Sequence, residues 1–214
     1  MISDKSRFQT VPDDPIRTQI YTLRNGLRLF MSVNPEEPRI YTEIAVRAGS
    51  KHDPADTTGL AHYFEHMMFK GTDRLGSLQW DKEKPLLDAI CALFEEHRRE
   101  KDPEKKKKLY AEIDRLSAEA AQYVAANEYD KLISAIGAKD TNAYTWVEQT
   151  VYVNDIPGNE LERWFQLECE RFRRPILRLF HTELETVFEE YNINQDRDFR
   201  KVLRVMQEML TPSH

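Results

Sequence analysis

The sequence is poor in cysteine and carries no excess of basic charge. Its two cysteines, Cys91 and Cys169, stand far apart and form no C-x-x-C pair that could bind a metal or support redox chemistry. Both are therefore expected to be small core residues. The formal net charge is −6. Because a nucleic-acid-binding surface needs a basic field, this charge argues against nucleic acid as a main partner.

Long apolar runs are also missing. No run reaches the roughly 20 residues that a membrane-spanning helix needs, and residues 1–5 lack the apolar block of a secretory signal. We therefore expect no membrane span and, by default, a cytoplasmic location, or a periplasmic or organellar one if a leader has been removed. The 214 residues suffice for one sizeable core, which predicts one domain over residues 1–214.

The order of apolar patterns predicts strands first and helices later. Alternation in residues 19–23 and 27–33, joined by Asn25-Gly26, is typical of a β-hairpin. The other predicted strands are 40–46, 143–145 and 150–154, and the later helices are 129–136, 159–172 and 182–210. This order favours an α+β fold, with a mainly antiparallel sheet and helices packed on one face.

A further helix is predicted near residue 60. Leu60, Phe64 and Met67 recur at three- and four-residue spacing, Thr58 can serve as the N-cap, and Gly71 stands where the helix would end. This helix would carry the side chains that follow.

Residues 62–66 read H-x-x-E-H. On a helix, His62 and His66 project from one face and can bind one metal ion, while Glu65 at the edge of that face can hydrogen-bond a metal-bound water. A single helical histidine is more often an ordinary core or surface residue. The combination therefore indicates a zinc site that still lacks a third ligand.

The residues around this motif carry a resemblance to a known family. Residues 59–72 resemble the metal-binding helix of the inverzincins, the insulinase, pitrilysin and mitochondrial-processing-peptidase family (M16) of zinc peptidases. Residues 23–28 resemble its opening hairpin and residues 45–50 the strand before its zinc helix. Residues 142–145 and 148–152 resemble its substrate-side strand pair.

The resemblance implies a complete zinc site. His62, His66 and Glu190 would bind Zn2+, Glu65 would be the general base, and Glu183 would be a supporting catalytic carboxylate. Because Glu183 and Glu190 are seven positions apart, they share one face of a helix. The competing interpretation is an acidic, solvated helix face.

The resemblance also implies a substrate-binding strand. Asn142, Ala143 and Tyr144 would lie along a sheet edge to which an extended peptide substrate can add through backbone hydrogen bonds. An ordinary strand inside the sheet is the alternative.

The spacing of the ligands departs from the family pattern. Glu190 follows His66 by 124 positions, on the order of fifty more than the resemblance implies. Residues 81–128 contain no glycine and show two amphipathic patterns separated by Asp102-Pro103. They predict a helical hairpin inserted into the domain.

The function that the resemblance implies is that of a zinc metalloendopeptidase, a hydrolase of short or unfolded peptides. The alternative is a non-catalytic M16-like partner or scaffold domain, but the chain keeps every expected motif residue, which favours an enzyme. Family members have a second, related half. We therefore expect the domain to be truncated at its C-terminal end, and a second M16-type half or subunit to be needed for full activity.

Overall fold

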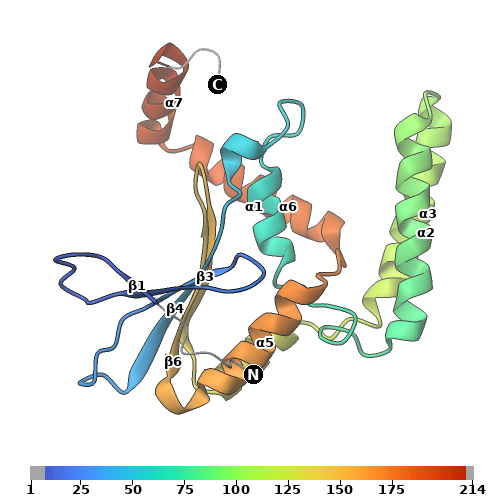
Figure 1. The fold of residues 1–214 in the computed structure, drawn as a ribbon. Coiled ribbons are helices and arrows are strands. Elements are labelled where there is room, and N and C mark those ends of the chain that lie inside the picture. Colours follow the sequence, from blue (N-terminus) through green and yellow to red (C-terminus); the bar gives the residue numbers. More distant parts are fainter. Residues whose placement is uncertain (1–7, 211–214) are drawn as a thin grey trace. The chain divides into compact units, whose positions relative to one another are not determined.

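The computed structural model describes residues 8–210 and divides near residue 40 into two units (Figure 1). The N-terminal unit holds a sheet in which β1 (Gln9–Thr10), β2 (Gln19–Thr22) and β3 (Arg28–Met31) lie in that order, with both pairings antiparallel. Gly26 in the β2–β3 turn has a φ of 87°, a conformation that glycine adopts without steric cost. The predicted hairpin is therefore confirmed.

The second unit holds a second sheet. Its strands are β4 (Arg39–Val46), β5 (Lys139–Thr145) and β6 (Thr150–Pro157), in the order β4-β6-β5. The central strand β6 is buried along most of its length, whereas β5 is an edge strand among the described residues. The α+β class is confirmed. In this sheet β4 pairs with β6, which is distant from it in the sequence.

All the described α-helices belong to the second unit. They are α1 (Leu60–Met67), α2 (Trp80–Arg99), α3 (Pro103–Ala121), α4 (Glu128–Ala135), α5 (Leu161–Arg173), α6 (Phe180–Gln195) and α7 (Asp198–Leu210). The single helix predicted over residues 182–210 is thus two helices. Within residues 8–210, none of the helices has both the length and the apolar character needed to cross a bilayer.

Helix α1 begins differently from the prediction. Its N-cap is Gly59, with a φ of 92°, rather than Thr58. The carboxylate of Asp53 accepts hydrogen bonds from the backbone N–H groups of Gly59 and Ala61, both at 2.8 Å. A side chain from the preceding loop therefore satisfies donors at the helix start that an N-cap side chain would otherwise serve. The helix ends at Met67, four residues before the predicted stop at Gly71, which has a φ of 91° in the turn that follows.

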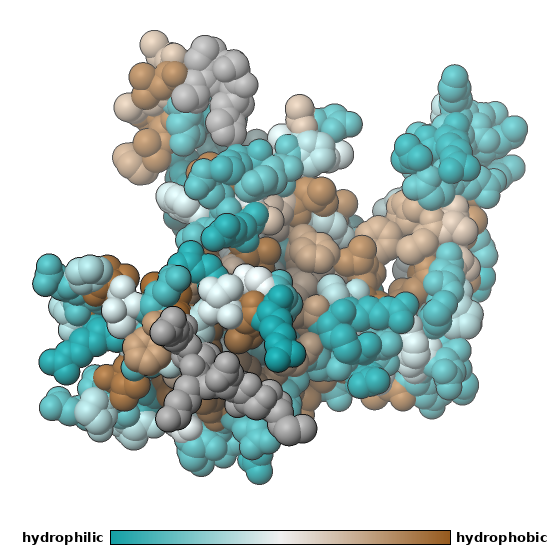
Figure 2. Space-filling view, in the orientation of Figure 1, coloured by the Kyte–Doolittle hydropathy of each residue, from teal (hydrophilic) through white to brown (hydrophobic). Residues whose placement is uncertain are grey.

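Helices α2 and α3 lie side by side around their own apolar cluster (Figure 1). The buried members are Ile90, Ile113, Leu116 and Ala120. The Asp102 side chain caps α3, accepting from the Glu104 N–H at 2.9 Å. Figure 2 shows a hydrophilic surface over the end of the pair where the two helices join. The two predicted helices are confirmed; that residues 81–128 are an insertion stays a prediction.

Both cysteines were placed wrongly in the core. Cys91 and Cys169 are free and exposed. Each follows a residue that takes the inward position of its helix, Ile90 on α2 and Glu168 on α5. Because adjacent helical residues point about 100° apart, the cysteines face outward.

Two buried ion pairs tie the second unit together. The first is centred on Arg178, whose guanidinium is 1% exposed and donates to the wholly buried Glu83 of α2 at 2.7 Å. The same guanidinium donates to the carbonyls of Lys70, Thr72 and Leu75 at 2.6 to 3.1 Å. Arg178 therefore joins the segment after α1, helix α2 and the residues that lead into α6.

The second buried pair is Arg171 with Glu168. The Arg171 Nε donates to Glu168 at 3.0 Å, and Tyr129 donates to the same carboxylate at 2.6 Å. The Arg171 guanidinium lies 4.5 to 5.3 Å from the ring centres of Phe69, Tyr129, Tyr152 and Phe172. These cation–π contacts join α4, α5 and β6 to the turn after α1.

We expect Arg178→Met to lower the free energy of unfolding by about 3–5 kcal/mol, because it leaves the buried Glu83 charge without its partner. Arg98→Met is the control, since Arg98 pairs with Glu95 on the surface and should contribute at most about 1 kcal/mol. Urea titration of both variants measures the difference. Equal losses in the two variants would contradict the structural role of Arg178.

Candidate metal centre

Helices α1 and α6 bring three metal-binding side chains together. His62 and His66 come from α1 and Glu190 from α6, and their ligand atoms all lie within 4.8 Å of one another. The two Nε2 atoms are 3.2 Å apart, and the Glu190 Oε2 lies 3.5 Å from that of His62 and 3.6 Å from that of His66. The structure thus gathers the three ligands that the sequence predicted.

These separations fit a zinc ion. Zinc binds imidazole nitrogen and carboxylate oxygen at about 2.0–2.2 Å, so two ligands at a tetrahedral angle should be about 3.4 Å apart. The observed 3.2, 3.5 and 3.6 Å lie around that value. Three protein ligands leave one tetrahedral position for water or substrate, as in catalytic zinc sites.

Glu183 supports the site from the first turn of α6. Its Oε1 lies 2.8 Å from the Nδ1 of His66, so an N–H on Nδ1 leaves the Nε2 lone pair directed at the metal position. Its Oε2 pairs with Lys70, which the sequence analysis did not single out. Burial by itself would raise the pKa of Glu183, but hydrogen bonds from Lys70 and His66 outweigh that effect and lower it.

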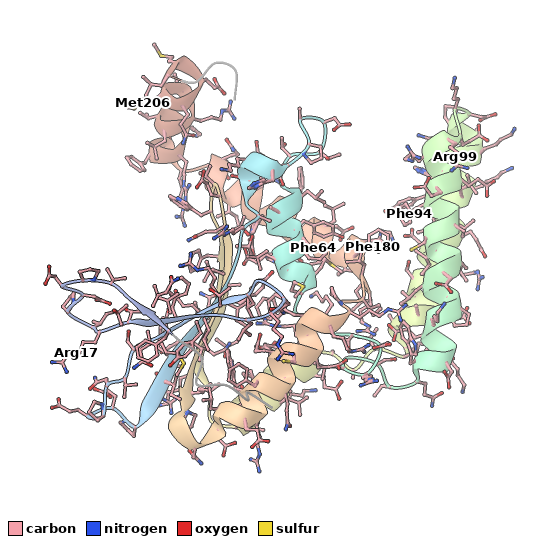
Figure 3. All side chains as sticks on the ribbon, in the orientation of Figure 1. Arg17, Phe64, Phe94, Arg99, Phe180 and Met206 are labelled. Carbon is pink, nitrogen blue, oxygen red and sulfur yellow. The ribbon has the colours of Figure 1, made fainter. Side chains whose placement is uncertain are left out.

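A further contact fixes the start of α6. The Tyr63 hydroxyl donates to the carbonyl of Phe180 at 2.5 Å. Burial, followed by the charge of Glu183, raises the pKa of Tyr63 to about 12, so the phenol keeps its proton at neutral pH. Figure 3 shows Phe180 close to Phe94 of α2, and their ring centres are 5.0 Å apart. The first residue of α6 is therefore held by both α1 and α2.

Glu65, the predicted general base, lies between α1 and the sheet. The residue is 6% exposed, and its Oε2 accepts from the Thr145 hydroxyl of β5 at 2.5 Å. Thr145 also lies 3.3 Å from the Thr150 hydroxyl, which donates to the carbonyl of Ala48 at 2.8 Å. Because an ionised carboxylate can only accept a hydrogen bond, the Thr145 hydrogen is directed to Glu65. Only the strand register reveals this contact, so the sequence analysis missed it.

The predicted substrate residues lie on the edge strand β5. Asn142, Ala143 and Tyr144 pair with Val153, Tyr152 and Val151 of β6. Asn142 and Tyr144 are exposed, whereas Ala143 is half-buried. Helix α1 contacts both β5 and α6, so the strand lies beside the helix that carries the motif (Figure 1). Among the described residues β5 is at the sheet edge; that it binds substrate stays a prediction.

The fold and the ligand set define a class of protein, an α+β domain whose metal centre is built from a helical H-x-x-E-H motif and a glutamate of a second helix. Residues 28–84 match the family described as insulinase, peptidase family M16. The chain is 42% identical over 192 residues to the probable mitochondrial-processing peptidase subunit beta of Arabidopsis thaliana. The aligned region covers 90% of this chain and 24% of that protein.

Other similar proteins also include a zinc protease and a solved structure of pitrilysin. An uncharacterized zinc protease, YmxG of Bacillus subtilis, is 36% identical over 52 residues, 24% of this chain and 13% of its own length. The crystal structure of pitrilysin superposes with a TM-score of 0.62 at 18% identity, covering 98% of this chain and 18% of that one. The chain belongs to the insulinase family, M16, which contains zinc proteases. It spans about a quarter or less of the length of these relatives.

We expect Glu190→Gln to weaken zinc binding by at least about 100-fold, because it removes the charged ligand of the three. Titration against a competing chelator measures the affinity. Glu189→Gln alters the neighbouring exposed residue and should stay within about twofold of the unchanged chain. Equal zinc affinity in the Glu190→Gln variant and the unchanged chain would remove Glu190 from the ligand set.

Proposed function

We propose that this chain carries the metal centre of a zinc endopeptidase that hydrolyses short or unfolded peptides. The observation that carries the proposal is the tetrahedral spacing of the His62, His66 and Glu190 ligand atoms. Membership of a family with zinc proteases supports the metal and the reaction class.

The roles of the side chains follow from their positions. Zinc bound by the three ligands would act as a Lewis acid and lower the pKa of a bound water to about 7. Glu65 would take the proton from the attacking water and later deliver it to the leaving amine. Thr145 occupies its Oε2, which leaves Oε1 for this exchange. Glu183 would keep the His66 ring oriented for the metal.

The peptide would bind along β5. An extended chain can add to an exposed edge through main-chain hydrogen bonds, which gives affinity with little demand on sequence. The Ala143 N–H donates a hydrogen bond to the Asn142 side-chain oxygen at 2.9 Å. This donor is thus satisfied by a side chain that can rotate away when a peptide arrives.

We further propose that a second M16-type half or subunit completes the enzyme. The chain covers about a quarter of the length of the processing-peptidase relative, whose name describes one subunit. The alternative function is a partner or scaffold domain without chemistry. The gathered ligands and the buried, hydrogen-bonded Glu65 support the enzyme, since a scaffold has no need of either.

Glu65→Gln should lower peptide hydrolysis by about 10²- to 10⁴-fold, because an amide cannot accept the proton, and should leave zinc affinity nearly unchanged. Cleavage of an internally quenched peptide is measured with a longer protein that contains these residues, or with this chain joined by its second half. Glu162→Gln, at an exposed position of α5, is the control. Retained hydrolysis in the Glu65→Gln variant would refute the general-base role.

A further inference from the structure

Helix α6 carries Glu190, yet apolar burial between α6 and α1 is limited. Val187 is the buried apolar side chain that the structure describes on α6, and Phe180 packs partly buried against the α2–α3 cluster. Leu184, Phe188, Tyr191 and Ile193 are exposed. Removal of apolar surface from water is the usual force that holds a helix in place. The position of α6 against α1 must therefore depend strongly on polar contacts.

The central polar contact is the carboxylate of Glu183. One oxygen lies 2.8 Å from the His66 Nδ1 and the other pairs with the Lys70 ammonium. The Glu183 and Lys70 side chains are 13% and 26% exposed, so water screens this ion pair less than a surface pair. The hydrogen bond from Tyr63 to Phe180 fastens only the first residue of α6.

Lys70 is itself held firmly. Its N–H donates to the Met67 carbonyl at 3.0 Å, and its carbonyl accepts from the Arg178 guanidinium at 2.6 Å. Arg178 lies two residues before α6 begins. The backbone that carries the Lys70 ammonium is therefore fixed to the same buried arginine that fixes the approach to α6.

We infer that Lys70 is a positioning residue that holds α6 on α1 before any metal is bound, and so places Glu190 opposite the two histidines. The inference rests on the proposed function for the identity of the metal ligands. The Lys70–Glu183 pair links α6 to the turn that follows α1. Zinc on His62, His66 and Glu190 would add a second link that makes the first dispensable.

Hydrogen exchange of the α6 amides, measured by mass spectrometry on the 214-residue chain with and without zinc, tests this inference. Without zinc, Lys70→Met should make the amides of residues 183–190 exchange roughly tenfold faster, because α6 opens more often. Lys70→Arg keeps the charge and should stay near the unchanged chain. With zinc bound, the exchange rates of the unchanged chain, Lys70→Met and Lys70→Arg should be nearly equal. Zinc affinity is a poorer measure, since removing a cation beside the metal position also favours zinc electrostatically.

Two controls isolate the contact. Lys84→Met removes an exposed pair with Asp88 on α2 and should leave α6 exchange unchanged. Adding Lys70→Met to Glu183→Gln should produce no further acceleration, because both changes break the same pair.

Unchanged α6 exchange in zinc-free Lys70→Met overturns the inference, as does acceleration in Lys70→Arg equal to that in Lys70→Met. If Lys70→Met accelerates exchange in α2 and α3 as much as in α6, the Glu183→Gln variant decides between the two explanations. Faster exchange confined to α6 in Glu183→Gln supports the inference, and unchanged α6 exchange in that variant overturns it. If zinc slows exchange in none of the proteins while Lys70→Met still loosens α6, the metal assignment fails and the positioning role stands.

Discussion

The buried guanidinium of Arg178 is the constraint on which the rest of the second unit depends. The histidines lie on α1 and the glutamate on α6, and 124 positions separate them in the sequence. The Arg178 guanidinium donates hydrogen bonds to three carbonyls of the segment after α1 and to the carboxylate of Glu83 on α2. Its backbone lies two residues before α6 begins. Arg178 thus fixes the two chain segments that lead from α1 and into α6, the helices whose ligand atoms lie 3.2 to 3.6 Å apart.

Buried charges of this kind are costly to desolvate, and their value lies in specificity as much as in stability. Five guanidinium N–H donors in a fixed plane can satisfy several carbonyls and a carboxylate at once, whereas an apolar residue of equal volume would leave those acceptors unpaired. The Arg171–Glu168 pair fixes α4, α5 and β6 in a comparable way, with aromatic rings in place of carbonyls. The metal centre is therefore placed by polar groups that do not belong to it.

Sequence reasoning found the parts of the site that depend on short-range spacing. The H-x-x-E-H motif and the Asn25-Gly26 turn are local patterns, and the structure has them on a helix and in a hairpin turn. Glu183 and Glu190 were named from the family resemblance, and the structure brings both to the histidines of α1. It missed contacts that no periodic pattern marks. Asp53 replaces Thr58 at the start of α1 from six residues before the N-cap, and Thr145 reaches Glu65 across eighty positions. Such contacts follow from tertiary structure, which no periodicity encodes. The exposed cysteines show the same limit, because burial of a small residue depends on its neighbours.

The hydrogen bond from the Ala143 N–H to the Asn142 side chain has a consequence for solubility. An edge strand that offers bare main-chain donors is a template for any other strand, including a second copy of the same protein, and this is how many aggregates begin. A donor already occupied by a neighbouring amide is a weaker template. Any strand that pairs with this edge must displace that amide, at a net cost of about 1 kcal/mol. The Asn142 side chain thus lowers the tendency of β5 to pair with a second copy of the protein.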